Sequence, residues 1–364
     1  MPVVRFVEWF RGALTALNRK LAPPPIALFE MFTAAAGAQA VCAAAQLGIA
    51  DALAAGPRGL SELAADIGAD PGYLRRLMRW LISQGIFTQH PDQTYALTPL
   101  AEPLRTDAPV SLHSFARFIG SAQHRQYWSY LSDAVRNGTV VIPEAMGGLP
   151  FFDYVRKDRE FGAIFDDAMT SISELMLEPM LAAGNFGQYG TIVDIGGGRG
   201  RLLAEILARA PETRGILFDL PEVVADVPVV DRCTVVAGSF FEAVPEGGDA
   251  YILKHIVHDW PDDLAEKILR TVHDAMTDSA RLLLLEIVLP EGNRPHRGNF
   301  LDLEMMVSAG GRERTEHEFR ELLAAAGFDL VRVIPTITPD SIVEARKVID
   351  NTPPLPRRDL GEVE

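Results

Sequence analysis

The sequence has few cysteines, a shortage of positive charge and no long apolar run. Its two cysteines, Cys42 and Cys233, lack the spacing of a metal site, which predicts free, buried thiols in a reducing compartment. Lys and Arg number 34 against 49 Asp and Glu, and the resulting net charge of -15 repels nucleic acids. Charges interrupt the N-terminal segment, and no run of about 18 apolar residues follows it. These shortages argue against membrane and nucleic-acid partners and predict a cytoplasmic protein.

The chain does contain enough apolar material for two cores, since 48% of its 364 residues are hydrophobic. We expect three parts. Residues 1–105 are predicted to form an N-terminal helical and winged-helix domain that mediates dimerisation. Residues 106–350 are predicted to form a helical bridge and an α/β catalytic domain, and residues 351–364 a loose tail.

The first fifty residues are predicted to be helical and to contact another subunit. Residues 3–21 show the three-to-four spacing of an amphipathic helix, which suits a membrane surface or, better, a packing arm on a second chain. Residues 26–55 are rich in alanine and contain only Glu30 and Asp51 as acidic residues. Helices of this composition are buried on more than one side.

Residues 60–98 have the pattern of a winged helix-turn-helix. Two helical segments are separated by the break at 69–72, and a short hairpin pattern follows them. Arg75, Arg76 and Arg79 suit DNA recognition, whereas the acidic chain as a whole favours use of the module in dimer packing.

The segment 106–186 is predicted to be a helical bridge. Within it an apolar stripe recurs every three or four positions and is predicted to be core: Phe161, Phe165, Met169, Ile172, Met176 and Met180. Its early turns also suit the wall of a pocket for a flat aromatic ligand, because Met and Phe pack adaptably.

From Gly190 onward, short apolar runs alternate with helical patterns. This alternation predicts a mostly parallel, doubly wound sheet covered on both faces, with ligands at the carboxyl ends of its strands. The predicted strands are TIVDI, GILFDL, CTVVAG, AYILKH, ARLLLLEIVL and FDLVRVIPT, and the predicted helices span 201–210, 222–228, 262–276 and 316–326.

The turn VDIGGGRG, residues 193–200, follows the first of these strands. It misses the dinucleotide fingerprint because Arg201 stands where the third glycine belongs, and it lacks the ending of a phosphate loop. Asp194 would repel a pyrophosphate but suits the positive, phosphate-free S-adenosylmethionine. Asp219, at the end of the next strand, suits ribose hydroxyls or, alternatively, a helix N-cap. Phe240 is placed to face an adenine ring.

His258, in LKHIVHDWPDD, is the predicted general base. Methyl transfer from a sulfonium needs a nucleophile that has lost at least part of its proton, such as a phenol. A phenol has a pKa near 10 and imidazole one near 6.5, so transfer of the phenol's proton to the ring costs roughly 5 kcal/mol unless acids stabilise the charged ring. Glu286 and Glu313 are the candidate acids. His255, His258 and Asp259 also invite a metal-site interpretation, but we expect no further ligand nearby and predict no metal. A capping or surface role for His258 is the remaining alternative.

These motifs, together with DLEMMVSAGGRERT and SIVEARKV, resemble those of the S-adenosylmethionine-dependent small-molecule O-methyltransferases over residues 26–348. The resemblance implies a homodimer, a Rossmann-like catalytic domain, and His258 as base flanked by Glu286 and Glu313. The implied cofactor-binding residues are Asp194, Gly196, Gly197, Gly198, Asp219, Leu220, Ser239, Phe240, Lys254 on the adenosine side, and Ser173 near the methionine carboxylate. The implied acceptor-pocket residues are Phe161, Phe165, Met169, Met305 and Met306.

Two departures from the family pattern accompany this resemblance. Ser239 stands where the family commonly has an aspartate beside the adenine, and the segment before GGRERT is one residue shorter than in plant members. The sequence therefore predicts methyl transfer to a phenolic or enolic hydroxyl of a small aromatic or polyketide-like molecule, without naming the acceptor. An adenosylmethionine-responsive DNA-binding regulator and an NAD-linked oxidoreductase remain rival hypotheses.

Overall fold

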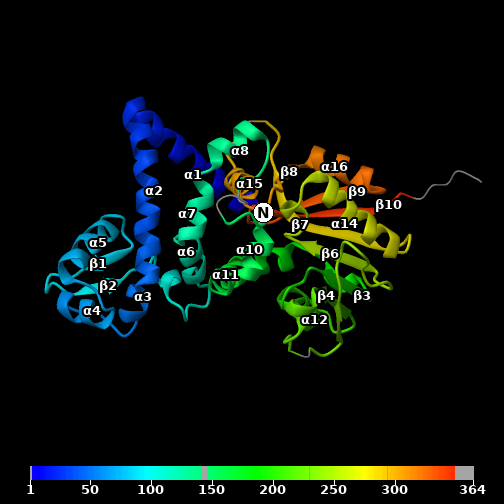
Figure 1. Cartoon of the computed structure of the whole chain (residues 1–364), viewed down its shortest axis with the longest axis horizontal. Coiled ribbons are helices and arrows are strands. Elements are labelled where there is room, and N and C mark those ends of the chain that lie inside the picture. Colours follow the sequence, from blue (N-terminus) through cyan, green and yellow to red (C-terminus); the bar gives the residue numbers. More distant parts are fainter. Residues whose placement is uncertain (1, 142–145, 229, 293, 349–364) are drawn as a thin grey trace, which may run out of the picture.

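The computed structural model describes residues 2–141, 146–228, 230–292 and 294–348, and the predicted tail 351–364 lies outside these described residues. Figure 1 shows a helical N-terminal part on one side, a central group of helices, and a sheet with its covering helices on the other side. This arrangement matches the predicted α/β class, with helices preceding a mostly parallel sheet.

The chain begins with two long helices, α1 (Pro2–Leu21) and α2 (Pro24–Gln46), as the spacing predicts. The C-terminal part of α2 is buried at Cys42, Ala44 and Ala45, and α2 packs against α6 (His113–Ile119). Its N-terminal part is mostly exposed, with Phe29 at 62% and Phe32 at 68%. Among the described helices, α2 alone has the length and mean hydropathy of a helix that could cross a membrane. The expectation that no long apolar run follows the N-terminal segment therefore does not hold for α2.

The winged helix-turn-helix prediction is correct in its elements. The helices α3 (Ile49–Ala52), α4 (Leu60–Asp66) and α5 (Pro71–Ser83) precede the antiparallel hairpin of β1 (Phe87–Gln89) and β2 (Tyr95–Leu97). Asp70 produces the predicted break, because its side chain accepts the Tyr73 N–H and caps α5. Apolar side chains from all three helices and the hairpin share one core.

The bridge consists of short helices that lead into the long α11 (Arg159–Ala183). Its earlier elements are η1 (Glu102–Leu104), α6, α7 (Ala122–Trp128), α8 (Leu131–Asn137) and α10 (Phe151–Lys157), and η2 (Phe186–Gln188) follows α11. The predicted core stripe on α11 is only partly correct. Phe161 and Met180 at its ends are buried, but Met169 is 37% exposed. The middle of the stripe lies near Ser173, whose Oγ accepts a hydrogen bond from Lys254 at the carboxyl end of a central strand of the sheet.

The sheet has the strand order β5-β4-β3-β6-β7-β10-β9, with β8 pairing with β7. Five strands are parallel neighbours: β3 (Thr191–Ile195), β4 (Arg214–Asp219), β5 (Cys233–Ala237), β6 (Ala250–Lys254) and β7 (Arg281–Leu289). The antiparallel β10 (Asp340–Lys347) lies between β7 and β9 (Phe328–Pro335), and β8 is Arg314–Thr315. The apolar-run pattern missed β8 and β10.

Helices cover both faces of this sheet. The elements are α12 (Arg201–Arg209), α13 (Pro221–Val224), η3 (Val257–Asp259), α14 (Asp262–Ala275), α15 (Gly298–Val307) and α16 (Glu316–Ala325). Side chains of α14 and α16 pack against one face of the sheet and form one core with it. Side chains of α11 and α12 form a second core with other side chains of the sheet. Both cysteines are free thiols, as predicted, but Cys233 on β5 is only half-buried.

Candidate active site

The glycine turn after β3 closes tightly beside the loop that follows β6. Gly196 has φ +67°, in the left-handed region that glycine adopts without strain. A Cβ there would stand 2.5 Å from the Ile256 side chain, so glycine also lets the two loops meet. Phe240 borders the same turn and packs edge-on against Phe241 and Trp260. The predicted cofactor turn and the predicted chemical loop are therefore neighbours.

Asp194 places a buried carboxylate under this turn. It is 2% exposed, and its Oδ2 atom has no hydrogen-bond partner among the described residues. Burial raises the pKa of Asp194 to about 7, although the nearby Lys254 ammonium opposes the rise. Lys254 donates a hydrogen bond of 2.5 Å to Ser173 Oγ on α11. The ammonium therefore lies beside Ser173, the residue predicted to lie near the methionine carboxylate, and the predicted adenosine-side role of Lys254 remains a prediction.

Asp219 ends β4 beside the glycine turn. Its Oδ2 accepts the Gly198 N–H at 2.8 Å, and its Oδ1 accepts the Leu220 N–H at 2.7 Å. Leu220, not Asp219, occupies the N-cap position of α13, so the capping alternative is wrong. Burial raises the pKa of Asp219, while the two backbone N–H groups oppose this. Each oxygen retains a lone pair for a further donor.

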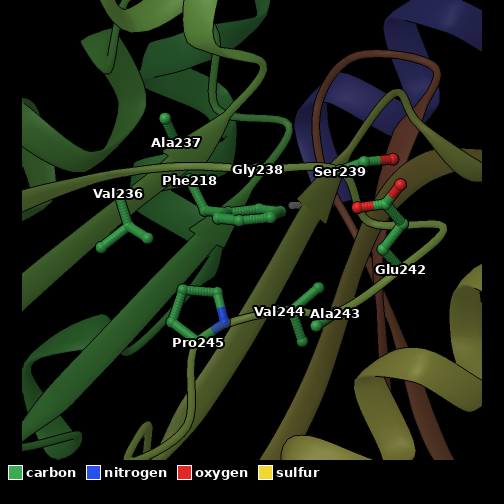
Figure 2. Close-up of a pocket in the computed structure, with 9 residues that line it drawn as sticks. All are labelled: Phe218, Val236, Ala237, Gly238, Ser239, Glu242, Ala243, Val244 and Pro245. Atoms are coloured by element: carbon green, nitrogen blue, oxygen red, sulfur yellow. The ribbon is translucent and has the colours of Figure 1, made fainter.

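A cavity of about 300 Å³ adjoins the end of β5. Figure 2 shows Ser239 and Glu242 at one end of this cavity and Phe218 across its middle. Ser239 Oγ accepts the Phe241 N–H at 3.3 Å. The hydroxyl thus stands where the family pattern has a carboxylate, but Glu242 brings a carboxylate to the same cavity.

His258 lies in η3 among three carboxylates, of which Glu286 and Glu313 are buried and Asp259 is partly exposed. Its Nδ1 is 2.8 Å from Glu313 Oε1 and 3.6 Å from Glu286 Oε2, and its Nε2 is 3.4 Å from Asp259 Oδ1. Burial alone would lower the pKa of His258, but Glu286, Asp259 and Glu313 together raise it to about 10. This burial excludes the surface-histidine alternative.

Backbone groups fix the acids around His258. Glu286 Oε1 accepts the N–H groups of Ile256 and Val257 at 3.1 and 2.9 Å, which leaves Oε2 directed at His258. The Glu313 N–H donates to Asp302 Oδ1 at 2.9 Å. Burial raises the pKa of Glu286 to about 7, with His258 opposing the rise.

The GGRERT segment is held against the His258 loop. A Cβ on Gly311 would stand 1.9 Å from the His258 carbonyl oxygen, so any other residue would separate the two segments. Arg314 is buried and donates to the carbonyls of Val257 and Trp260 and to the Asp262 carboxylate. The sequence analysis missed this anchoring role.

The expectation that no further metal ligand lies near His258 is wrong. Nitrogen or oxygen atoms of His258, Glu286 and Glu313 lie within 4.8 Å of one another, while His255 pairs with Asp340 instead. The 2.8 Å separation between His258 Nδ1 and Glu313 Oε1 is that of a hydrogen bond. A shared proton therefore accounts for the contact between these two side chains without a metal ion.

The predicted acceptor-pocket residues have different degrees of burial. Phe161 is fully buried and packs against Phe118 and Phe151, so in this structure it belongs to the aromatic core. Phe165, in ring contact with Phe118 and Phe151, is half-buried, and Met169 is exposed. On α15, Met305 is buried and Met306 half-buried. Their roles in acceptor binding remain predictions.

A buried cluster of hydrogen bonds around Glu304 joins the bridge to α15, and the sequence did not predict it. Glu304 accepts hydrogen bonds from Tyr127 OH at 2.5 Å and Trp128 Nε1 at 2.6 Å, and His124 Nε2 lies 3.2 Å away. A partial signal was available, because Glu304 is an acidic residue directly beside two methionines in a largely apolar helix. Its partners, however, lie more than 170 positions earlier.

Comparison with known proteins identifies the class. A family model described as an O-methyltransferase domain matches residues 128–329, and one described as an O-methyltransferase dimerisation domain matches residues 29–107. The chain therefore belongs to the O-methyltransferase family, and it is an S-adenosylmethionine-dependent methyltransferase, as the motif resemblance predicts.

Particular relatives cover almost the whole chain. Phenazine O-methyltransferase PhzM of Lysobacter antibioticus is 40% identical, over 92% of this chain and all of the relative. The crystal structure of LaPhzM has a TM-score of 0.84, with 40% identity over 90% of this chain and all of that one. Human N-acetylserotonin methyltransferase, solved with S-adenosylmethionine, has a TM-score of 0.83 at 26% identity over 90% of this chain and 99% of that one. These relatives lend no support to the DNA-binding regulator or the NAD-linked oxidoreductase.

Proposed function

We propose that this enzyme methylates a phenolic hydroxyl of a small aromatic metabolite, with His258 as the general base. One observation carries the proposal: a buried imidazole stands among three carboxylates, in a loop that touches the glycine turn. Because Nδ1 is bonded to Glu313, Nε2 is the nitrogen that would face the phenol. Once the ring and the phenol together have lost one proton, Nε2 would hold the proton that remains and leave a phenolate. Glu313 and Glu286 then stabilise the imidazolium that forms.

The energetics of this site suit a phenol. An ordinary imidazole is too weak a base for a phenol by roughly 5 kcal/mol. The carboxylates raise the pKa of His258 to about 10, close to the ordinary phenol value, so the transfer becomes nearly even in free energy. Alignment of the phenolic oxygen with the methyl group of the sulfonium then supplies much of the remaining rate enhancement of methyl transfer.

The crevice beside the glycine turn fits S-adenosylmethionine. The unpartnered Oδ2 of Asp194 is a buried acceptor suited to a cation and hostile to a phosphate. When bound, this cofactor supplies a methyl group on a positively charged sulfonium. Lys254 and Ser173 would hold its carboxylate and Asp219 its ribose hydroxyls. The turn glycines Gly196, Gly197 and Gly198, together with Leu220, Ser239 and Phe240, would line the rest.

The acceptor is proposed to be a flat aromatic molecule, held between α11 and α15 by Phe165, Met169, Met305 and Met306, with Phe161 behind them. Several relatives have names that agree with this class. The NcsB1 structure, 33% identical over 86% of this chain and 96% of that one, with a TM-score of 0.73, contains 2-hydroxy-5-methyl naphthoic acid. The 8-amino-8-demethylriboflavin N,N-dimethyltransferase of Streptomyces davaonensis is 33% identical over 84% of this chain and 90% of the relative, so an amine acceptor is the second candidate.

The enzyme is proposed to act as a homodimer in the cytoplasm. The apolar side chains exposed on α1 and α2 in a single chain need a covering partner: Phe10, Leu14, Leu17, Leu21, Ile26, Leu28, Phe29, Met31 and Phe32. Most of these α2 residues fall within the matched dimerisation domain. A second copy that covers this surface would account for its composition better than a membrane, because the C-terminal part of α2 packs within the protein.

A single substitution tests the base assignment. We first screen phenolic and polyketide-like libraries with isotope-labelled S-adenosylmethionine to obtain an acceptor. His258→Gln should then bind S-adenosylmethionine with wild-type affinity by calorimetry, yet its single-turnover rate should fall roughly 100-fold or more. His317→Gln, on the exposed face of α16, is the matched control. A His258→Gln rate within about threefold of wild type would remove the base role, since a positioned base contributes at least roughly 100-fold.

A further inference from the structure

A second histidine stands directly against the proposed base. The rings of His255 and His258 are stacked, with centroids 5.3 Å apart and planes 15° from parallel. This is the offset geometry that flat rings prefer. The other side of His255 is tethered, because its Nε2 lies 2.7 Å from Asp340 Oδ1 on β10. Thr338 Oγ1 in turn donates to Asp340 Oδ2 at 3.2 Å.

The backbone of His255 is strained in a way that shapes the site. Its φ is +53°, which few residues other than glycine adopt, and its N–H still donates to Leu285 O in the neighbouring strand. The chain turns sharply at this point. The next two N–H groups, those of Ile256 and Val257, both reach Glu286 Oε1. Strain of this kind persists only where the surroundings fix it, and the Asp340 bond is such a constraint.

We propose that His255, tethered by Asp340, is a positioning residue for His258: its uncharged ring stacks on the base, fixes the plane of that ring and stabilises its imidazolium form. This inference rests on the proposed role of His258. An aromatic ring of zero charge attracts a cation over its face, whereas a second imidazolium would repel it.

The charges around both rings agree with an uncharged His255. Burial lowers the pKa of His255, with the Asp340 carboxylate opposing this and Lys254 and His258 adding to it. The side chain of Asp340 is buried, and its bond to His255 helps to keep its pKa below the ordinary value despite that burial. A carboxylate can only accept, so the neutral ring of His255 donates through Nε2. The acids Asp259, Glu286 and Glu313 face His258, not His255.

Two substitutions at one position separate stacking from tethering. His255→Asn keeps a residue that tolerates the left-handed backbone but removes the ring. We expect unchanged calorimetric affinity for S-adenosylmethionine and a single-turnover rate roughly 10-fold lower. The alkaline rise of the pH–rate profile should level off at a pH lower by roughly half a unit to one unit, because the imidazolium loses its stacking partner and the pKa of His258 falls. His255→Phe keeps a ring without the tether, so its profile should stay near that of wild type while its rate falls.

The control is His317→Asn on the exposed face of α16, and thermal melting establishes that each variant is folded. A His255→Asn rate and profile equal to wild type would overturn the proposal, and so would a slower rate with an unmoved profile. If His255→Asn does not fold, His255→Phe provides the test. A His255→Phe profile shifted by as much as the shift expected for His255→Asn would overturn the proposal, because Phe keeps a ring beside His258. These results are distinct from failure of the base assignment, in which His258→Gln itself would retain the wild-type rate.

Discussion

Replacing Glu286 by Gln should weaken the proposed base while leaving its geometry intact. The amide oxygen can still accept the Ile256 and Val257 N–H groups, so the loop keeps its anchor. What disappears is a negative charge 3.6 Å from His258 Nδ1. With an effective dielectric constant of about 20, a unit charge at this distance contributes about 5 kcal/mol, or roughly three pKa units.

The consequence should appear in the pH dependence of methyl transfer. The reactive state is the His258 imidazolium beside a phenolate, so the ring and the phenol together hold one proton. The population of this state grows with pH until most of the pairs have lost their second proton. In the wild type the rise should continue toward the raised His258 pKa of about 10. In Glu286→Gln it should level off roughly three pH units lower, at a plateau roughly 1000-fold below that of the wild type.

The sign of the effect also predicts where the two enzymes agree. Burial raises the pKa of Glu286 to about 7, so in the wild type this carboxyl gains its proton as pH falls through neutrality. The Glu286 carboxylate therefore stabilises the His258 imidazolium at pH values above the pKa of Glu286, and this stabilisation is lost at lower pH. The two rates should converge near neutral pH and diverge in the alkaline range.

The assay is single-turnover methyl transfer by rapid quench, with a phenolic acceptor from the library screen, across the neutral and alkaline range. Glu321→Gln, an exposed acid on α16, is the matched control and should follow the wild-type profile. A Glu286→Gln profile that superimposes on that of the wild type would refute the reasoning, because Glu286 would then contribute nothing to the basicity of His258.

Three further predictions concern the cofactor, the assembly and the stability of the fold. Asp219→Ala should weaken calorimetric binding of S-adenosylmethionine by roughly 30-fold, because the ribose hydroxyls lose their proposed acceptor and the turn N–H groups of Gly198 and Leu220 lose theirs, and an unchanged affinity would show that another residue holds the ribose. The double variant Phe29→Ser and Phe32→Ser should be monomeric by light scattering, since it removes exposed apolar surface from α2, and a persistent dimer would place the interface elsewhere. Glu304→Gln should lower the free energy of unfolding in urea by about 2 kcal/mol, because its hydrogen bonds lose their charge, and unchanged stability would show that the cluster does not join the bridge to α15.

Much of the sheet was predictable because its strands have a local signature. Buried parallel strands such as β6 and β7 are continuous apolar runs, and the rule that ligands lie at the carboxyl ends of strands placed Asp194, Asp219 and His258 correctly at one edge. The strand β10 was missed because it mixes charged residues with apolar ones, and only its position between β7 and β9 makes it a strand.

The parts of the site that could not be predicted depend on contacts between distant segments. His255 and Asp340 are 85 positions apart, and nothing in either segment indicates that they pair. The same holds for the raised pKa of His258, which acids from three segments produce against the opposing effect of burial. On α11 the regular stripe predicted mostly core and left a pocket wall open for its early turns, because sequence spacing shows which residues share a face but not whether that face meets a core or a crevice.

The basicity of His258 is the central claim, and nuclear magnetic resonance of enzyme labelled with 15N at histidine measures it directly. The His258 ring signals, assigned by their loss in His258→Gln, should remain those of an imidazolium through neutral pH and titrate near the raised pKa of about 10. A titration near the ordinary imidazole value of about 6.5 would contradict the account, because the surrounding carboxylates would then not stabilise an imidazolium beside a phenolate.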